Sequence, residues 1–271
     1  MTHGPTGTPG LVATDLDGTL LRSDESLSPR TRAALEKAVA AGAVHVIVTG
    51  RSVQTAGPVF DDLRYDGLAV CGQGAQLYDA GAHELVAAHT IDVNAVRTVL
   101  HRLAEAIGPV HVAVARAGIA GGFHGPATMP WPWDLVPLHP ATEADLWAEP
   151  VMKAFLNHDR LPVDELAAAV RSAGNGFFEA VNAGGDLVEL VPAGVTKATG
   201  LAEVAARLGC AAEDTIAFGD MPSDVPMLVW AGYGVAMANG HHEAIAVADE
   251  VAPSNDEDGV AVVLERVYGT G

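Results

Sequence analysis

Two carboxylates stand two residues apart in the segment 15–19, which has the sequence Asp-Leu-Asp-Gly-Thr. A carboxylate is a weak nucleophile, but an oriented carboxylate beside a metal ion can attack phosphorus. Asp15 is therefore a candidate nucleophile, and Asp17 could give a proton to the leaving group and later take one from water. Gly18 lets the backbone turn, so amides near Gly18 and Thr19 can face an anion. The five residues alone leave a plain turn open as the alternative.

A second acidic loop lies at residues 219–224, Gly-Asp-Met-Pro-Ser-Asp. Asp220 could join Asp15 in holding a hard cation through oxygen ligands. Mg²⁺ fits this arrangement because it is commonly held by one or two carboxylates together with phosphate and water. The alternative is a helix-entry turn capped by Ser223 or Asp224.

Phosphate-binding groups are candidates at two further places. The hydroxyl of Thr49 and the free amides of Gly50 and Arg51 could bind phosphate oxygens at a helix start. For this motif alone a plain helix cap is the favoured alternative, and Arg51 could simply cover the surface. Lys197 begins another predicted helix, where a cation is disfavoured. A lysine at that position indicates an anionic neighbour, with an exposed lysine as the alternative.

Strands and helices alternate around these residues. We expect strands at 11–14, 44–48 and 68–70, a helix from Ser28-Pro29 to Gly42, and a helix from Ser52. The pattern returns with a helix at 198–208, a strand at 215–218, a helix at 225–230 and a strand at 234–237. This order predicts an α/β fold with a doubly wound parallel sheet. Ligands bind such sheets at the carboxyl ends of strands, where Asp15 and Thr49 both stand.

The residues between these halves have a different pattern, which predicts an inserted α+β module. Helices are expected at 93–107 and 163–173, and strands at 110–114, 151–156, 177–181 and 187–191. We place a core at residues 1–82, with a flexible tail at 1–10, the module at 83–187, and the rest of the core at 188–271. Trp131 and Trp133 could line a lid but are expected to pack the module. Lys153 is expected on its solvated surface.

The four motifs, in this order, resemble those of the haloacid dehalogenase (HAD) superfamily, in particular the Cof-type phosphatases with a large inserted C2-type cap. The resemblance covers nearly the whole chain beyond the tail, and it implies a Rossmann-like core with an α+β cap. It implies that Asp15 is the nucleophile and Asp17 the general acid/base. It further implies that Thr49 binds the transferring phosphoryl group and that Lys197 steadies nucleophile and phosphate.

The resemblance also implies a Mg²⁺ site. Its ligands would be the side chains of Asp15 and Asp220 and the backbone carbonyl of Asp17, while Asp224 would support the metal shell or bind Lys197. Substrate contacts are expected at several family positions: Gly18, Thr19, Gly50, Arg51, Gly74 and Asn239. The chain has Ser223 where the family usually has Asn, and Gln73-Gly74 where it often has Asn-Gly, so hydrogen bonds there are expected to differ.

The formal net charge of −19 argues against nucleic acid and anionic membranes as partners. The chain has only three lysines, Lys37, Lys153 and Lys197, and a pocket of carboxylates and phosphate needs cations. We expect a soluble, cytoplasmic protein, because the first residues lack a signal-peptide pattern and no apolar run approaches the roughly 20 residues that span a bilayer. The sequence does not determine the oligomeric state.

The predicted function is that of a magnesium-dependent phosphomonoesterase acting on a small phosphorylated metabolite, with sugar phosphates favoured. The inserted module would close over the site and select the leaving group. A phosphomutase is one alternative. A regulatory phosphoacceptor is another, and Asp17 argues against it because a protein that keeps its phosphate gains little from a hydrolytic acid/base. A binding protein with a degenerate site is disfavoured because the principal motif residues are all present.

Overall fold

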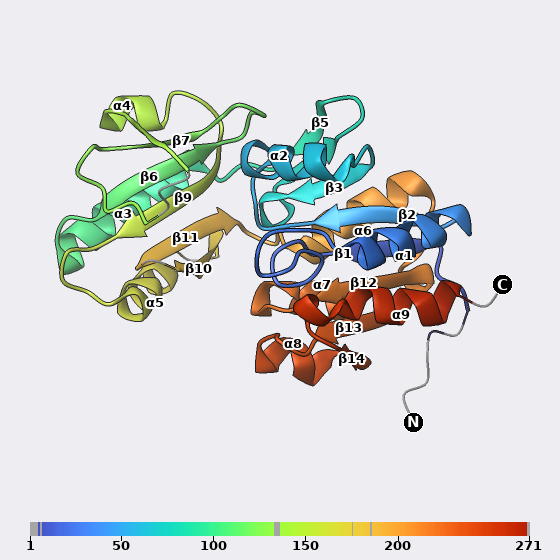
Figure 1. The fold of residues 1–271 in the computed structure, drawn as a ribbon. Coiled ribbons are helices and arrows are strands. Elements are labelled where there is room, and N and C mark those ends of the chain that lie inside the picture. Colours follow the sequence, from blue (N-terminus) through green and yellow to red (C-terminus); the bar gives the residue numbers. More distant parts are fainter. Residues whose placement is uncertain (1–4, 6, 133–135, 175, 185, 270–271) are drawn as a thin grey trace. The chain divides into compact units, whose positions relative to one another are not determined.

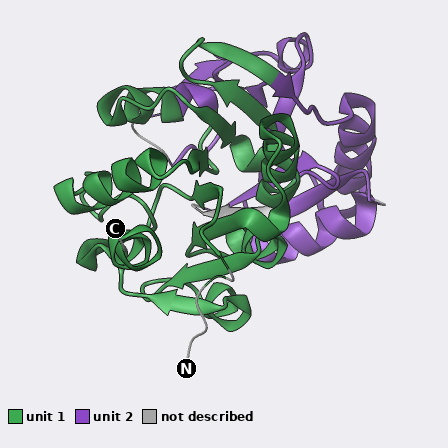
Figure 2. Cartoon of the chain, turned by 90° about the vertical axis from the view of Figure 1, so that its right-hand side faces the viewer, with its two compact units in different colours: residues 1–52, 56–86, 196–271 green, residues 53–55, 87–195 purple. Residues whose placement is uncertain are grey.

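The computed structural model describes residues 5, 7–132, 136–174, 176–184 and 186–269. The chain divides into two compact units (Figure 2). We call residues 1–52, 56–86 and 196–271 the core unit, and residues 53–55 and 87–195 the cap unit. The limits of 83 and 187 that the sequence predicts for an independent cap domain stay a prediction.

An eight-stranded sheet runs through the core unit, in the order β14-β13-β12-β1-β2-β3-β4-β5. Its strands are β1 (Leu11–Thr14), β2 (Val44–Val48), β3 (Leu68–Cys71), β4 (Gln76–Asp79), β5 (Glu84–Ala88), β12 (Thr215–Gly219), β13 (Tyr233–Met237) and β14 (Glu250–Ala252). The strands from β14 to β3 pair in parallel, and β4 returns antiparallel to β3. The predicted α/β class is confirmed, with an antiparallel edge that the sequence did not predict.

Helices cover both faces of this sheet. They are α1 (Pro29–Ala40), α2 (Val53–Leu63), α6 (Lys197–Leu208), α7 (Val225–Trp230), α8 (His242–Val247) and α9 (Gly259–Tyr268). From β1 the chain moves outward to β2, and from β12 it moves the other way to β13. Right-handed crossovers therefore place α1 and α7 on opposite faces. Helices α1 and α9 pack side by side on one face (Figure 1).

Local sequence explains where α1 begins and where α6 begins and ends. Ser28 caps α1 by accepting a hydrogen bond from the amide of Thr31, as its predicted cap position requires. Thr196 caps α6 in the same way, and α6 ends at Gly209 in the left-handed conformation, with φ 71°. The hydroxyl of Tyr268, the last residue of α9, donates to the carbonyl of Pro9, shortly before β1, at 2.7 Å. Part of the predicted 1–10 tail lies outside the described residues.

The cap unit has its own six-stranded sheet, ordered β10-β11-β9-β6-β7-β8. Its elements are α3 (Val93–Ile107), β6 (His111–Arg116), β7 (Phe123–Gly125), β8 (Leu138–Pro140), α4 (Glu143–Leu146), β9 (Val151–Asn157), α5 (Val163–Gly174), β10 (Phe178–Gly184) and β11 (Leu187–Pro192). Helices α3 and α5 contact each other and share one apolar core with the sheet. The expected α+β composition is present.

Two expectations about side chains of the cap unit can be compared with the structure. Trp131 packs against Phe123 and Phe155, and its indole Nε1 donates to the carbonyl of Val136 at 2.7 Å, as the packing interpretation predicts. Trp133 lies outside the described residues. Lys153, expected at the surface, is buried and forms an ion pair with Glu189.

Across the described part of the chain, none of the helices combines the length and the apolar character that a membrane crossing demands.

Candidate active site

The Asp15 carboxylate lies directly after β1 and is buried, with 4% of the residue exposed. Its backbone amide donates to the carbonyl of Phe218 on β12, 3.0 Å away, which ties the start of the loop to the neighbouring strand. The Lys197 ammonium donates to Asp15 Oδ1 at 2.8 Å. The position of the candidate nucleophile is thus fixed by a backbone hydrogen bond to β12 and by the Lys197 ammonium.

Lys197 is the first residue of α6 and is buried between two carboxylates. Its Nζ lies 2.8 Å from Asp15 Oδ1 and 2.6 Å from Asp224 Oδ1. Burial lowers the pKa of this amine, but the charges of Asp15 and Asp224 outweigh burial and raise it above its usual value. The anionic neighbour that the sequence predicts for a lysine at a helix start is present, and Lys197 carries its proton at neutral pH.

The acidic loop after β12 brings Asp220 and Asp224 to the same place. Asp224 Oδ2 accepts hydrogen bonds from the amides of Asp220, at 3.1 Å, and Met221, at 2.9 Å. Thr19 donates its hydroxyl hydrogen to Asp220 Oδ1 at 2.8 Å. Residues from both predicted motifs therefore contact each other directly, although they are about 200 positions apart in the sequence.

Asp15, Asp220 and Asp224 form a buried group in which one oxygen of each lies within 4.8 Å of the others. Burial raises the pKa of Asp15 well above its usual value, against the opposing effect of Lys197. Burial, aided by the charge of Asp224, also raises the pKa of Asp220 to about 6. A divalent cation would relieve this repulsion, and the all-oxygen donor set suits Mg²⁺. The residues present thus fit the predicted metal.

The Asp17 carboxylate points elsewhere and pairs with Arg51. Arg51 Nε donates to Asp17 Oδ2 at 2.9 Å, and Nη2 donates to Asp17 Oδ1. Glu25 lies 3.6 Å from the same guanidinium. The sequence predicts Arg51 as a contact of the substrate, whereas in this structure it binds the candidate acid/base. One sign of the pairing is available in the sequence, because Asp17 and Arg51 follow neighbouring strands β1 and β2 at the same offset from Asp15 and Thr49.

Thr49 is fully buried at the end of β2. Its Oγ1 accepts a hydrogen bond from the Arg51 amide at 3.0 Å, and its own amide donates to the carbonyl of Val70 at 2.7 Å. Gly50 follows with little free space, because a Cβ atom there would lie 2.7 Å from Nε2 of Gln73. These bonds fix the turn in which the hydroxyl of Thr49 was predicted to meet phosphate, and that role stays a prediction.

Two of the predicted glycines are required by close approach. Gly18 has φ +77°, and a Cβ there would lie 2.5 Å from Asp220 Oδ2. Gly74 has φ +104°, and a Cβ there would lie 2.2 Å from the carbonyl oxygen of Thr196, the residue that caps α6. Gly74 therefore lets the start of α6 approach β3, which places Lys197. A substrate contact of Gly74 stays a prediction.

Asn239 follows β13, and its side chain connects the loop after Asp15 to Asn255. Its Nδ2 donates to the carbonyl of Gly18 at 2.8 Å, and its Oδ1 accepts from the amide of Asn255 at 3.0 Å. Asn255 in turn donates through Nδ2 to the carbonyl of Leu21 at 2.9 Å. The sequence analysis did not identify Asn255. Asn255 is the first residue of a 3₁₀ turn (Asn255–Glu257) whose other two residues are exposed, and this offers no pattern from which the contact could be predicted.

Comparisons with known proteins agree with this architecture. The family model of the haloacid dehalogenase-like hydrolases matches residues 12–264. The pyridoxal phosphate phosphatase YbhA of Escherichia coli is 31% identical, over 93% of this chain and 96% of its own. The 5-amino-6-(5-phospho-D-ribitylamino)uracil phosphatase YcsE of Bacillus subtilis is 27% identical, over 94% of both chains.

A solved haloacid dehalogenase-like hydrolase of Bacteroides thetaiotaomicron has the same fold. It superposes with a TM-score of 0.77 at 26% identity, covering 96% of this chain and 99% of its own. Because the family model spans nearly the whole chain and a phosphatase relative exceeds 30% identity across it, the protein belongs to the haloacid dehalogenase-like hydrolases, as a phosphatase of the Cof type that its motifs resemble.

Proposed function

We propose that this enzyme is a magnesium-dependent phosphatase that transfers the phosphoryl group of a small phosphorylated metabolite first to Asp15 and then to water. One observation carries the proposal. The Asp15 carboxylate is buried, lies 2.8 Å from the Lys197 ammonium, and belongs to a cluster of three carboxylates that calls for a further cation. A purely structural role would not require so many buried charges at one strand end.

In the first step, an oxygen of Asp15 forms a bond to phosphorus while the bond from phosphorus to the leaving oxygen breaks. Lys197 orients the carboxylate by binding Oδ1, and its charge stabilises the transferring group. Asp17 supplies the proton that the leaving oxygen needs. In the second step, Asp17 accepts a proton from water, the water oxygen attacks phosphorus, and the bond to Asp15 breaks to release phosphate.

The Mg²⁺ ion would be held by Asp15 and Asp220, with the backbone carbonyl of Asp17 as the third protein ligand that the sequence predicts. Both oxygens of Asp224 already accept hydrogen bonds, from Lys197 on one side and from two amides on the other. We therefore assign Asp224 to orienting Lys197 rather than to direct ligation. When bound, the ion supplies positive charge that keeps the cluster ionised and stabilises negative charge on the phosphoryl group.

The pair of Asp17 and Arg51 belongs to the same mechanism. Asp17 has to hold a proton in order to act as an acid, and it has to leave the guanidinium to reach the leaving oxygen. An incoming phosphate dianion competes with Asp17 for Arg51, since arginine binds both groups through two parallel hydrogen bonds. We propose that substrate binding exchanges the partner of Arg51 and frees Asp17.

The relatives support a small substrate. YbhA is a phosphatase of pyridoxal phosphate, and YcsE is a phosphatase of a ribityl phosphate attached to a pyrimidine ring; both compounds are small phosphate monoesters. Sugar phosphates remain the first choice from the sequence. A test panel should therefore hold sugar phosphates, ribityl phosphates and pyridoxal phosphate.

The experiment is a screen of this panel for released phosphate, with Mg²⁺ and with a chelator. Turnover should require Mg²⁺, and Asp15→Asn should reduce it by at least about 10⁴-fold, as expected for loss of a nucleophile. Asp62→Asn, an exposed aspartate of α2, serves as the matched control. Unchanged turnover in Asp15→Asn would exclude the mechanism. An isomerised sugar phosphate in place of free phosphate would instead identify a mutase, and a long-lived phosphorylated Asp15 a phosphoacceptor.

A further inference from the structure

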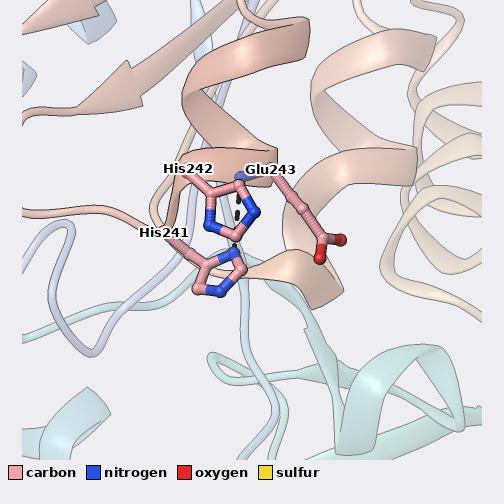
Figure 3. A group of neighbouring side chains, drawn as sticks. All are labelled: His241, His242 and Glu243. Atoms are coloured by element: carbon pink, nitrogen blue, oxygen red, sulfur yellow. Dashed lines mark hydrogen bonds between the residues drawn. The ribbon is translucent and has the colours of Figure 1, made fainter.

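Three consecutive residues at the start of α8 present metal-binding side chains together. His241, His242 and Glu243 each offer one ligand atom, and these atoms lie within 4.8 Å of one another (Figure 3). His242 and Glu243 are exposed, and His241 is half-buried. The group lies outside the carboxylate cluster of Asp15, and the phosphatase mechanism uses none of the three side chains.

The two imidazole rings lie next to each other, and one nitrogen of each belongs to the group of ligand atoms within 4.8 Å. Their ring centroids are 4.2 Å apart, with an angle of 40° between the planes. His241 Nδ1 accepts a long hydrogen bond from the Glu243 amide, at 3.3 Å. Accepting this bond places the ring proton on Nε2 and the lone pair on Nδ1. A metal ion can therefore bind Nδ1 of the neutral ring without removing a proton, in exchange for one weak contact.

We propose that His241, His242 and Glu243 bind a first-row transition metal ion of the Zn²⁺ class. Two imidazole nitrogens and one carboxylate oxygen are a donor set that Zn²⁺ and its neighbours in the series use, with water in the remaining positions. Mg²⁺ prefers oxygen ligands and suits the carboxylates of Asp15 and Asp220 instead. The two sites would thus select different metals by the chemistry of their donors.

The main chain joins this site to the acidic loop. The backbone amide of His241 donates to the carbonyl of Asp220 at 2.7 Å. Gly240 lies so close to the loop that a Cβ there would be 2.8 Å from the same carbonyl oxygen. An ion that pulls His241 and His242 together therefore acts on the backbone of a residue proposed to bind Mg²⁺. We expect the occupied site to lower Mg²⁺-supported turnover.

The test is calorimetric titration of the untagged full chain with Zn²⁺ in excess Mg²⁺, which does not depend on turnover and so stands apart from the proposed function. Wild-type protein should bind one Zn²⁺ that the double variant His241→Asn/His242→Asn does not bind. Asparagine at 241 retains an acceptor that can cap α8. Glu243→Gln should weaken binding by at least roughly tenfold, since even changes outside the ligands cost that much at metal sites.

His101→Asn is the matched control, because His101 is an exposed helical histidine whose Nδ1 lies 3.6 Å from one carboxylate, that of Glu105. It should leave Zn²⁺ binding unchanged. Equal Zn²⁺ stoichiometry and affinity in wild type and the double variant would overturn the site. The effect on the catalytic loop has its own test, in which Mg²⁺-supported turnover is measured with and without Zn²⁺. If Zn²⁺ lowers turnover equally in wild type and the double variant, or lowers it in neither, the binding site does not act on the loop.

Discussion

Replacing Asp220 by asparagine should stabilise the metal-free protein while removing its response to Mg²⁺. Asparagine has the shape of aspartate, and its Oδ1 can still accept the hydrogen bond that Thr19 donates. The change removes one negative charge from the cluster with Asp15 and Asp224. The free energy of unfolding should rise by the amount that ionising this buried carboxyl now costs. Activity should be lost because the proposed metal ligand is gone.

The size of the gain follows from the pKa of Asp220, which burial raises from 3.8 to about 6. Between these values the unfolded chain loses the proton while the folded chain keeps it, so folding becomes less favourable as pH rises. At about 1.4 kcal/mol per pKa unit, the loss is less than about 1 kcal/mol at pH 4 and about 3 kcal/mol at pH 7. Asp220→Asn should recover these amounts, so its advantage should grow as pH rises from 4 to 7.

The assay is urea unfolding in chelator at pH 4 and pH 7, followed by hydrogen exchange of amides in β1 and β12. A local measurement is needed because the chain has two units, which need not unfold together. Asp214→Asn, an exposed aspartate just before β12, is the control and should change little. A variant at Asp220 that is no more stable than wild type at pH 7, or whose advantage is the same at both pH values, would refute the reasoning.

Three further predictions concern the loops and the metal. Gly74→Ala should lower the free energy of unfolding by about 2–5 kcal/mol, because alanine is strained at this positive φ and its Cβ clashes with the Thr196 carbonyl. Gly194 also has a positive φ, +71°, but open space around it, so Gly194→Ala should cost only about 1–2 kcal/mol. Equal losses in urea titrations would contradict the clash. Arg51→Ala should lower kcat/KM by about 10²-fold, because the substrate phosphate loses the guanidinium that is proposed to bind it in exchange for Asp17, with partial rescue in Arg51→Lys; steady-state kinetics equal to wild type would exclude this exchange of partners. Mg²⁺ should raise the melting temperature more at pH 7 than at pH 5, since protons compete for Asp220 at the lower pH; an equal rise at both would contradict ligation by its carboxylate.

The sequence allowed the positions of the core strands and of Lys197 to be predicted because both follow from local rules. Apolar runs that end at a carboxylate or hydroxyl marked β1 and β2, and a lysine at the start of α6 indicated the anionic partners that the structure shows at 2.8 and 2.6 Å. The hairpin of β4 and β5 was not predicted. It follows a turn in which Gln73 has φ 62°. In β5 the apolar run 85–88 does not alternate with polar residues, although every second residue of the strand, Val86 among them, is exposed, so the period that marks a half-buried strand is missing.

Ion pairs between distant residues were the second kind of omission. Equal offsets after neighbouring strands bring Asp17 and Arg51 near each other, but the bond itself depends on the rotamers of two partly exposed side chains, which local sequence does not determine. The buried pair of Lys153 and Glu189 could have been found. Each charge interrupts an apolar run, and charged residues are almost never fully buried without a partner. Two such interruptions on strands that pair, β9 and β11, indicate each other.

The central claim is that phosphate passes through Asp15, and one measurement tests it most directly. The Asp17→Asn variant, in which hydrolysis of the intermediate should be slow, is mixed with an aryl phosphate and Mg²⁺ and quenched in acid. Mass spectrometry of the peptide that contains β1 should then show one added phosphoryl group on Asp15. Aryl alcohol released in the first turnover without a phosphoryl group on Asp15, or with the group on another residue, would contradict the account.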